Sequence, residues 1–372
     1  MPPITVMIKL ASGLCNMRCK YCFYADEAAN RAQASYGLMS EATLEAVLRQ
    51  VLRYATGNCT IAFQGGEPTR AGLPFFQRAI ELETQYNVNH CHIENALQTN
   101  GYLMDDAWAA FFAQHHFLVG VSLDGPQEIH DANRVDAGGN GTYARVIKAI
   151  HLLQSHEVEF NVLTVVTSAA ARSIRKIYHF YGRNQLFYQQ YIPCLDPLGE
   201  ARGQQPWSLT PEMFERYLKN LFDCWYEDAA KNQKRYHRYF ENLMMMIAGQ
   251  RPEACGMSGV CERQYVVEAD GSVFPCDFYM LDAWKLGSFV TQSVEEIDAK
   301  RKELQFIELS ATPHPDCLAC KWGALCRGGC RRDREPFEQG ALSKNYFCKA
   351  YYNFFEYAYP RLLQIVRRYS AQ

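Results

Sequence analysis

The sequence predicts an α/β protein, with a parallel sheet closed or partly closed into a barrel and a cysteine-rich C-terminal region. Two observations predict the barrel. Short β-rich runs alternate with amphipathic helical patterns up to about residue 200 of the 372-residue chain, and such alternation is typical of parallel sheets. Polar, glycine-containing motifs also follow the β-rich runs, and a parallel barrel assembles its active site at that end of its strands.

The β-rich runs are expected to form six strands. They cover Ile4–Leu10, Cys59–Gln64, His90–Leu97, Phe117–Leu123, Glu159–Val166 and Phe187–Cys194. Helical patterns lie between them, near Leu44–Leu52, Pro74–Tyr86, Asp105–His115, Tyr143–Ser155 and Ala171–Tyr181. In the first of these patterns the apolar residues recur on one helix face, and Ser40 stands where an N-cap belongs.

Each predicted strand ends at a polar motif. A cysteine-containing loop follows the first strand, and the others end at Gln64–Pro68, Gln98–Gly101, Ser122–Gly125, Thr167–Ser168 and Leu195–Asp196. Because the C-terminal ends of parallel strands meet at one edge of a sheet, we expect these motifs to surround a single site.

The composition excludes several classes of protein. A net charge of −2, without any Lys/Arg-rich block, gives no field for nucleic acid. No apolar run of about eighteen residues exists to span a membrane, and the N-terminus lacks the pattern of a secretory signal. The chain is therefore expected to be cytoplasmic, where its 15 cysteines indicate metal ligation rather than disulfides. Four of them, in mostly apolar segments, are expected in the core: Cys59, Cys91, Cys194 and Cys224.

The alternation of β-rich and helical segments ends at about residue 200. Thr210 and Pro211 are typical of the N-cap and first residue of a helix. Further helices are expected over Tyr239–Ala248 and over the aromatic stretch Tyr346–Tyr369. Between them, Asp270–Gly271 predicts a hairpin turn joining two β-rich arms.

Three cysteines form the first motif with clear chemistry: Cys15, Cys19 and Cys22, in the order C-x3-C-x2-C. Three thiolates can hold three irons of a [4Fe–4S] cube and leave the fourth iron open to bind and reduce a small molecule. Zinc is the alternative, but zinc sites usually close with a fourth Cys or His, and none lies nearby. With Tyr21 and Phe23 beside its last cysteine, the motif resembles the signature of the radical S-adenosylmethionine (SAM) enzymes, which implies a partial (β/α)6 barrel.

Eight further cysteines lie in the C-terminal third of the chain, enough for two groups of four thiolates. On spacing alone, a pair of zinc knuckles is an open alternative. The pattern resembles the SPASM extension of peptide-modifying radical SAM enzymes, which carries two auxiliary [4Fe–4S] clusters and would bring the total to three. The resemblance implies one cluster on Cys255, Cys261, Cys276 and Cys330, and an outer one on Cys317, Cys320, Cys326 and Cys348.

These resemblances also predict how the chain divides into domains. Residues 1–235 are expected to form the radical SAM partial barrel with a linking helix. Residues 236–372 are expected to form the SPASM domain, which binds the auxiliary clusters, and the C-terminal helix.

Two stretches are more specific than the cysteine spacing and indicate one family among the radical SAM enzymes. They are Lys20–Tyr24 (KYCFY) and Pro275–Tyr279 (PCDFY). With the overall length they resemble the anaerobic sulfatase-maturating enzymes over essentially the whole chain. The resemblance implies oxidation of a Cys or Ser, in an unfolded or extended sulfatase segment, to Cα-formylglycine. A 5′-deoxyadenosyl radical would take hydrogen from Cβ, Asp277 would remove the thiol or hydroxyl proton, and an auxiliary cluster would accept the electron. An electron donor such as ferredoxin or flavodoxin is implied as a partner.

The same resemblance assigns SAM contacts to five residues: Tyr21, Gly66, Ser122, Arg134 and Leu195. Gly66 would let the backbone approach the ligand closely, and the forked donor of Arg134 suits a carboxylate. Gln64, Tyr24 and Gln98 are candidate peptide contacts. Taken singly, each of these residues has an ordinary alternative as a turn or surface residue.

Two other functions stay open on the sequence alone. SPASM domains also serve radical SAM enzymes that form thioether or carbon–carbon crosslinks in ribosomal peptides, although those often carry an N-terminal recognition domain and this sequence starts almost directly at its first strand. The other class is a non-catalytic electron-transfer or zinc-binding module, which needs neither an open three-cysteine site nor the strand-end motifs.

Overall fold

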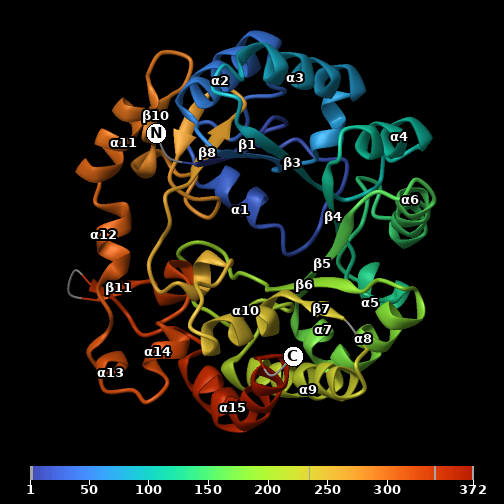
Figure 1. The fold of residues 1–372 in the computed structure, drawn as a ribbon, viewed down its shortest axis with the longest axis vertical. Helices are drawn as coiled ribbons and strands as arrows, with labels where there is room; N and C mark the ends of the chain where they lie inside the picture. Colours follow the sequence, from blue (N-terminus) through green and yellow to red (C-terminus); the bar gives the residue numbers. More distant parts are fainter. Residues whose placement is uncertain (1–2, 234, 339–340, 371–372) are drawn as a thin grey trace.

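A curved ten-stranded sheet is the main feature of the computed structural model, which describes residues 3–233, 235–338 and 341–370. Its strands follow the order β10-β9-β8-β1-β2-β3-β4-β5-β6-β7. Helices surround the outer side of the curve, whereas the short helix α1 (Phe23–Ala29) lies on the inner side (Figure 1). The predicted α/β fold with a partly closed parallel sheet is confirmed.

Six parallel strands form the barrel part of the sheet, and each predicted run lies within two residues of its strand at either end. They are β1 (Ile4–Lys9), β2 (Asn58–Phe63), β3 (His92–Thr99), β4 (Leu118–Ser122), β5 (Phe160–Val166) and β6 (Tyr188–Pro193). Each pairs in parallel with the next along the chain. The strand-end motifs therefore meet at one edge, as expected.

Helices occur at the predicted positions between these strands, with two differences: the short helix α5 was not predicted, and one predicted segment is divided. They are α2 (Glu41–Tyr54), α3 (Leu73–Tyr86), α4 (Asp106–Gln114), α5 (Gln127–His130), α6 (Tyr143–Ser155), α7 (Ser168–Arg172) and α8 (Ile174–Arg183). Ser40 caps α2 by accepting from the backbone N–H of Thr43. The expectation of one helix over Ala171–Tyr181 was wrong, because Ser173 leaves the helical conformation there and becomes the N-cap of α8.

The C-terminal region adds strands to both edges of the barrel sheet. β7 (Tyr236–His237) pairs with β6, and β8 (Tyr265–Glu268) pairs in parallel with β1. β9 (Ser272–Phe274) turns back along β8 and pairs with β10 (Gly287–Ser288). The predicted turn is confirmed, with Gly271 at a φ of 83° that favours glycine. Because β8 lies against β1, the cysteine-rich region sits directly beside the barrel.

The remaining helices follow the last barrel strand along the chain. They are α9 (Pro211–Ala230), α10 (Arg238–Ile247), α11 (Val294–Glu303), α12 (Phe306–Ala311), α13 (Pro315–Leu318), α14 (Gly323–Cys326) and α15 (Cys348–Ser370). Thr210 caps α9 and Pro211 begins it, as predicted. The aromatic helix α15 lies along α9, where the rings of Phe214 and Phe347 are 4.3 Å apart. Among the helices of the described residues, none combines the length and apolar character needed to cross a membrane.

Four cysteines outside the cysteine motifs belong to the core, as predicted. All are buried: Cys59, Cys91, Cys194 and Cys224. Burial raises the pKa of the Cys59 and Cys194 thiols to about 12. Thiols with such pKa values stay protonated at neutral pH and are therefore unreactive.

Candidate active site

The loop that carries Cys15, Cys19 and Cys22 connects β1 to α1 and packs against the loop after β2. The N–H of Gly66 donates to the carbonyl of Ser12 over 2.9 Å, and the N–H of Glu67 donates to the carbonyl of Leu14 over 2.9 Å. A Cβ on Gly66 would lie 2.1 Å from the carbonyl oxygen of Leu14. Only glycine therefore allows this close packing of the two loops, and the Gly66 N–H is already bound within the protein.

The side chain of Glu67 ties the same loop to the end of β3. Its buried carboxylate accepts from the hydroxyls of Thr69 (2.6 Å) and Thr99 (2.7 Å) and from the N–H of Asn100 (2.8 Å). Burial raises the pKa of Glu67, and these hydrogen bonds oppose the shift. The strand-end motifs thus hold one another in place through the side chain of Glu67, which was not among the predicted site residues.

The three N-terminal cysteines lie close together and largely out of solvent. Burial raises the pKa of Cys15 to about 11 and that of Cys19 to about 12, and the charge of Cys22 acts in the same direction on both. Arg134 has the opposite effect on Cys19. Such thiols lose their protons when a metal binds them, so the group is suited to hold a cluster rather than to act as free nucleophiles.

Two of the expected SAM contacts, Tyr21 and Arg134, meet behind the cysteine loop. The Tyr21 hydroxyl donates to Asp124, and the Arg134 Nε lies 3.0 Å from the same carboxylate. The guanidinium carbon of Arg134 is 5.4 Å from the centre of the Tyr21 ring. This buried trio joins the cysteine loop to the end of β4.

The other expected SAM contacts lie on separate elements around the strand-end edge. Ser122 ends β4 and accepts a hydrogen bond from Gln98 over 3.3 Å. Leu195 follows β6 and lines a small cavity together with Phe23 and Phe278.

Asp277 lies at a cavity of about 400 Å³ between the barrel and the cysteine-rich region. Gln64 and Gln98, from the ends of β2 and β3, line the same cavity. The Asp277 carboxylate accepts from the Tyr24 hydroxyl at 2.9 Å and from the Gln64 amide at 3.3 Å. Two candidate peptide contacts from the strand-end motifs, Gln64 and Gln98, therefore lie at the same cavity as Asp277.

Lys9, which the sequence analysis missed, is the charged partner of Asp277. It is the last residue of β1, is only 1% exposed and forms an ion pair with the carboxylate. Its Nζ also donates to the Tyr24 hydroxyl over 2.6 Å and lies 3.9 Å from the centre of that ring. A lysine at the end of an apolar strand was the available signal, because a buried lysine needs a partner.

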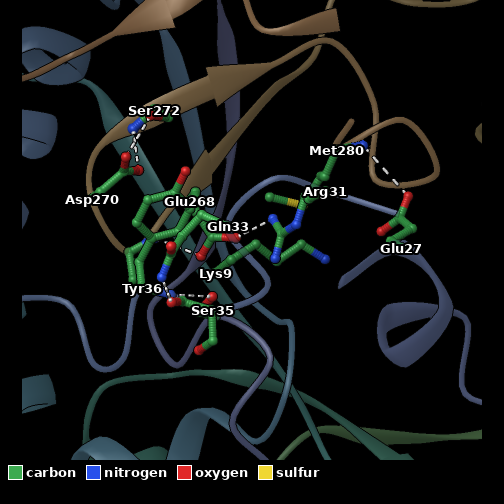
Figure 2. Close-up of polar contacts among 12 residues, drawn as sticks. Lys9, Glu27, Arg31, Gln33, Ser35, Tyr36, Glu268, Asp270, Ser272 and Met280 are labelled. Carbon is green, nitrogen blue, oxygen red and sulfur yellow. Dashed lines mark hydrogen bonds and ion pairs between the residues drawn. The ribbon is translucent and has the colours of Figure 1, made fainter. Parts of the chain in front are cut away.

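Three further titratable side chains, Glu27, Arg31 and Glu268, lie near Lys9 (Figure 2). Arg31 forms a buried ion pair with Glu268 at 2.6 Å, and Glu27 accepts from the N–H of Met280 over 3.4 Å. Burial, and then the charge of Asp277, raise the pKa of Glu27 to about 8. These contacts fasten α1 and the segment after it to the β8–β9 hairpin and the loop that carries Asp277.

The four cysteines of the expected inner set line the cavity that contains Asp277: Cys255, Cys261, Cys276 and Cys330. Burial raises the pKa of each of the four thiols. Their charges also influence one another, Cys276 being affected by Cys330 and Cys261. The structure thus brings together four thiols that are far apart in the sequence.

The expected outer set gathers around α13, α14 and the start of α15: Cys317, Cys320, Cys326 and Cys348. Burial, and then the charges of the other three cysteines, raise the pKa of Cys326 to about 11. Within the described residues, no group of three or more His, Cys, Asp or Glu side chains is close enough to hold a single metal ion. The inner set lines a cavity of about 400 Å³ together with residues of the barrel, and the donor chemistry of both sets is that of cluster ligands.

Comparison with known protein families gives two matches that together span both regions of the chain. The model of the radical SAM superfamily matches residues 11–180, which carry the three-cysteine loop and strands β2 to β5. The SPASM model, an iron–sulfur cluster-binding domain, matches residues 255–321, which include Asp277.

Relatives match the chain over nearly its whole length. It is 47% identical over 365 residues to the cysteine-type anaerobic sulfatase-maturating enzyme of Clostridium perfringens, covering 98% of this chain and 99% of that protein. The enzyme of the same description from Clostridium novyi is 39% identical over 367 residues, covering 99% and 98%. A solved structure, native anSMEcpe with bound AdoMet and Kp18Cys peptide, has a TM-score of 0.94 at 46% identity, covering 99% of this chain and 100% of that one.

Proposed function

Because this chain belongs to the anaerobic sulfatase-maturating enzymes of the radical SAM superfamily, we propose that it oxidises a cysteine in a sulfatase polypeptide to Cα-formylglycine. The main support for this proposal is the 47% identity to a cysteine-type enzyme over 98% of the chain. A solved relative holds AdoMet and an 18Cys peptide, and an extended polypeptide is accordingly the substrate form proposed here. The protein is a protein-modifying oxidoreductase.

Three [4Fe–4S] clusters are proposed as its resident cofactors. The N-terminal one would be held by Cys15, Cys19 and Cys22, with one iron left for SAM. The inner auxiliary cluster would bind Cys255, Cys261, Cys276 and Cys330, and the outer one Cys317, Cys320, Cys326 and Cys348. The shared cavity of the inner set and the mutual influence of the outer thiols support this division.

Asp277 is proposed as the general base. When bound, SAM and the clusters supply the radical that takes hydrogen from the target Cβ and the acceptor for the electron then lost. Asp277 would take the proton of the target thiol. Lys9 and Tyr24 hold its carboxylate in place. Since each carboxylate oxygen has two lone-pair directions, these contacts still leave Asp277 able to accept from the cavity.

SAM is proposed to contact Tyr21, Gly66, Ser122, Arg134 and Leu195. Support for the set comes from its distribution around the strand-end edge that carries the three-cysteine loop. Because the Gly66 N–H is bound to Ser12, its role toward SAM would fall to its carbonyl oxygen. Arg134 would act while paired with Asp124, so Asp124 orients the guanidinium.

The wider context of the protein is proposed as follows. Residues 1–235 would form the barrel domain and residues 236–372 the SPASM domain, joined through the β1–β8 pairing. All 15 cysteines are free thiols, which supports a reducing cytoplasm as its location. A ferredoxin or flavodoxin would supply the electrons that reduce the SAM-binding cluster.

An anaerobic assay tests this function directly. The holoenzyme is given SAM, a reductant and peptides that carry either Cys or Ser in a sulfatase-type motif, and the products are read by mass spectrometry. Aldehyde on the Cys peptide together with 5′-deoxyadenosine is expected. Aldehyde on the Ser peptide alone would contradict the cysteine-type function, and 5′-deoxyadenosine with both peptides unchanged would point to another peptide substrate.

A further inference from the structure

Arg334 is a buried cation between the two auxiliary cysteine sets. It is 3% exposed, and its guanidinium donates to the carbonyls of Ser310 (3.0 Å) and Thr312 (2.7 Å). Among the described residues, the ion pairs of this region involve Arg202 and Arg331 but not Arg334. Its positive charge is therefore met by carbonyl dipoles and by no carboxylate.

A buried guanidinium in such surroundings needs an anionic partner, because removing a charge from water is costly unless it is paired. Burial lowers the pKa of Arg334, and the thiolates of Cys317, Cys261 and Cys330 oppose that shift. Cys317 belongs to the outer set, whereas Cys261 and Cys330 belong to the inner one. Arg334 also lines the cavity of about 400 Å³ that contains the four cysteines of the inner set in its wall.

We propose that Arg334 is the shared counter-charge of the two auxiliary clusters and makes both easier to reduce. The inference rests on the cysteine sets of the proposed function. Four thiolates around a [4Fe–4S] core give a doubly negative group, which becomes triply negative when it accepts one electron. A fixed cation stabilises the triply negative form more strongly and so raises the reduction potential.

The other charged groups at the inner cavity have different settings. Arg331 packs over the rings of Tyr279, Trp284 and Phe306 and faces Glu335 at 3.8 Å. Asp277 is paired with Lys9. Arg238, Glu253 and Glu262 also line the cavity. The charges of Arg331 and Arg334 both lower the pKa of Cys261, and the pKa of Arg334 is in turn influenced by thiols from both sets.

The role in the reaction follows from the electron balance. In the proposed oxidation, hydrogen abstraction leaves a carbon radical, and Asp277 takes the thiol proton. The remaining oxidative step would be the transfer of one electron from the substrate to the inner auxiliary cluster, which gives a thioaldehyde; water then hydrolyses the thioaldehyde to the aldehyde and releases hydrogen sulfide. Arg334 would favour that transfer by raising the potential of the acceptor; it acts through the cluster and is therefore a positioning residue and not a catalytic one.

The test is a redox titration of the full-length holoprotein, monitored by electron paramagnetic resonance. A variant with Cys15, Cys19 and Cys22 replaced by alanine identifies the auxiliary signals. Arg334→Gln keeps an amide donor for the carbonyls and removes the charge, whereas Arg334→Lys keeps the charge. For Arg334→Gln we expect the equilibrium constant for auxiliary-cluster reduction to fall about tenfold, about 59 mV for a one-electron couple. Arg334→Lys should stay close to wild type.

Arg301 provides the matched control. It is also 3% exposed and donates to a backbone carbonyl, that of Gln264, over 2.6 Å. Its charge, however, is met by Asp298 at 3.4 Å. Arg301→Gln should therefore change stability but leave the auxiliary potentials unchanged.

The outcomes separate this inference from the proposed function. Wild-type protein lacking two auxiliary clusters would contradict the cysteine sets themselves. With both clusters present, unchanged potentials in Arg334→Gln would overturn the counter-charge role. Equal effects of Arg334→Gln and Arg334→Lys would also overturn it, since shape and hydrogen bonding would then be responsible. If Arg334→Gln loses iron, retention of iron by Arg334→Lys supports the role and loss in both overturns it.

Discussion

At the scale of single residues, Asp277 depends on neighbours from distant parts of the chain. Lys9 comes from the first strand, Tyr24 from the helix after the cysteine loop and Gln64 from the end of the second strand. A buried carboxylate without such partners would be costly. The aspartate is thus fixed in direction by groups that all precede residue 65 of the chain.

Replacing Asp277 with asparagine tests its role as the base. The amide keeps the size of the side chain but cannot take a proton, so we expect aldehyde formation to fall by about 100-fold or more. Cleavage of SAM should continue, giving 5′-deoxyadenosine with little aldehyde. Both products are quantified by mass spectrometry in the same sample. Asp282→Asn, at an exposed aspartate in the same loop, is the control, and normal aldehyde yield from Asp277→Asn would exclude the role.

The raised pKa of Glu27 should make the free energy of unfolding depend on pH. Its pKa is raised from 4.5 to about 8 by burial and by the charge of Asp277, so the folded protein keeps a proton that the unfolded chain releases. Stability therefore falls as the pH rises between these values, by about 1.4 kcal/mol per pH unit. Glu27→Gln should remove this loss, so the variant gains stability relative to wild type from about pH 5 to about pH 8. Thermal unfolding across that range measures the difference, and a gap that stays constant with pH would contradict it.

The groups of residues that lie together were predictable where a sequence motif contained them. The three groups of cysteines and Asp277 came from spacing and from family resemblance, and the structure brings each group together. Lys9 was missed because a single lysine in a strand has no motif, and its partner lies more than 250 residues away (Lys9 to Asp277). The partners of Arg134 and Glu67 were hidden for the same reason.

At the scale of elements, the site depends on loops that hold one another. The cysteine loop and the loop after β2 are joined by two backbone hydrogen bonds beside Gly66. Glu67 then joins the second loop to the end of β3. The geometry of the three cysteines is consequently set by contacts between strand ends and not by the cysteine loop alone.

Gly66→Ala should disturb the N-terminal cluster. The new Cβ would lie 2.1 Å from the carbonyl oxygen of Leu14, a distance that forces the two loops apart. We expect the variant to lose iron from the SAM-binding cluster and most of its SAM cleavage, while the auxiliary clusters persist. Gly13→Ala is the control in the same loop, because its Cβ would meet nothing closer than 3.6 Å. Equal iron content and SAM cleavage in both variants would show that the close packing is dispensable.

Elements with a strong local pattern were predicted well. The six barrel strands and most helices followed from period and capping, because those signals are local. The break between α7 and α8 was missed, since Ser173 can either continue a helix or cap one. The pairing of β8 with β1 was also out of reach, because a parallel contact between distant segments leaves no local signal.

At the scale of the whole molecule, the two regions share one sheet. β8 continues the barrel sheet beyond β1, and the Arg31–Glu268 ion pair closes the same junction. This arrangement places the loop with Asp277 over the strand-end edge. The sequence predicted both regions but not their junction, which is where the proposed chemistry takes place.

The division of the eight C-terminal cysteines can be tested by iron content. Cys317→Ala should remove the outer cluster and leave about two thirds of the iron of the wild type. Adding Cys348→Ala should remove little more, because both belong to one set. Adding Cys255→Ala instead should remove a second cluster and leave about one third. The reverse pattern, with additive losses for Cys317 and Cys348, would contradict the division.

The most direct test of the central claim follows a deuterium label from substrate to product. A sulfatase-motif peptide with deuterium on the Cβ of its target cysteine is incubated with the holoenzyme, SAM and a reductant. We expect deuterium to appear in 5′-deoxyadenosine, and we expect the amount of labelled 5′-deoxyadenosine to equal the amount of formylglycine aldehyde on the peptide. Unlabelled 5′-deoxyadenosine, or labelled 5′-deoxyadenosine with a peptide that carries no aldehyde, would contradict it.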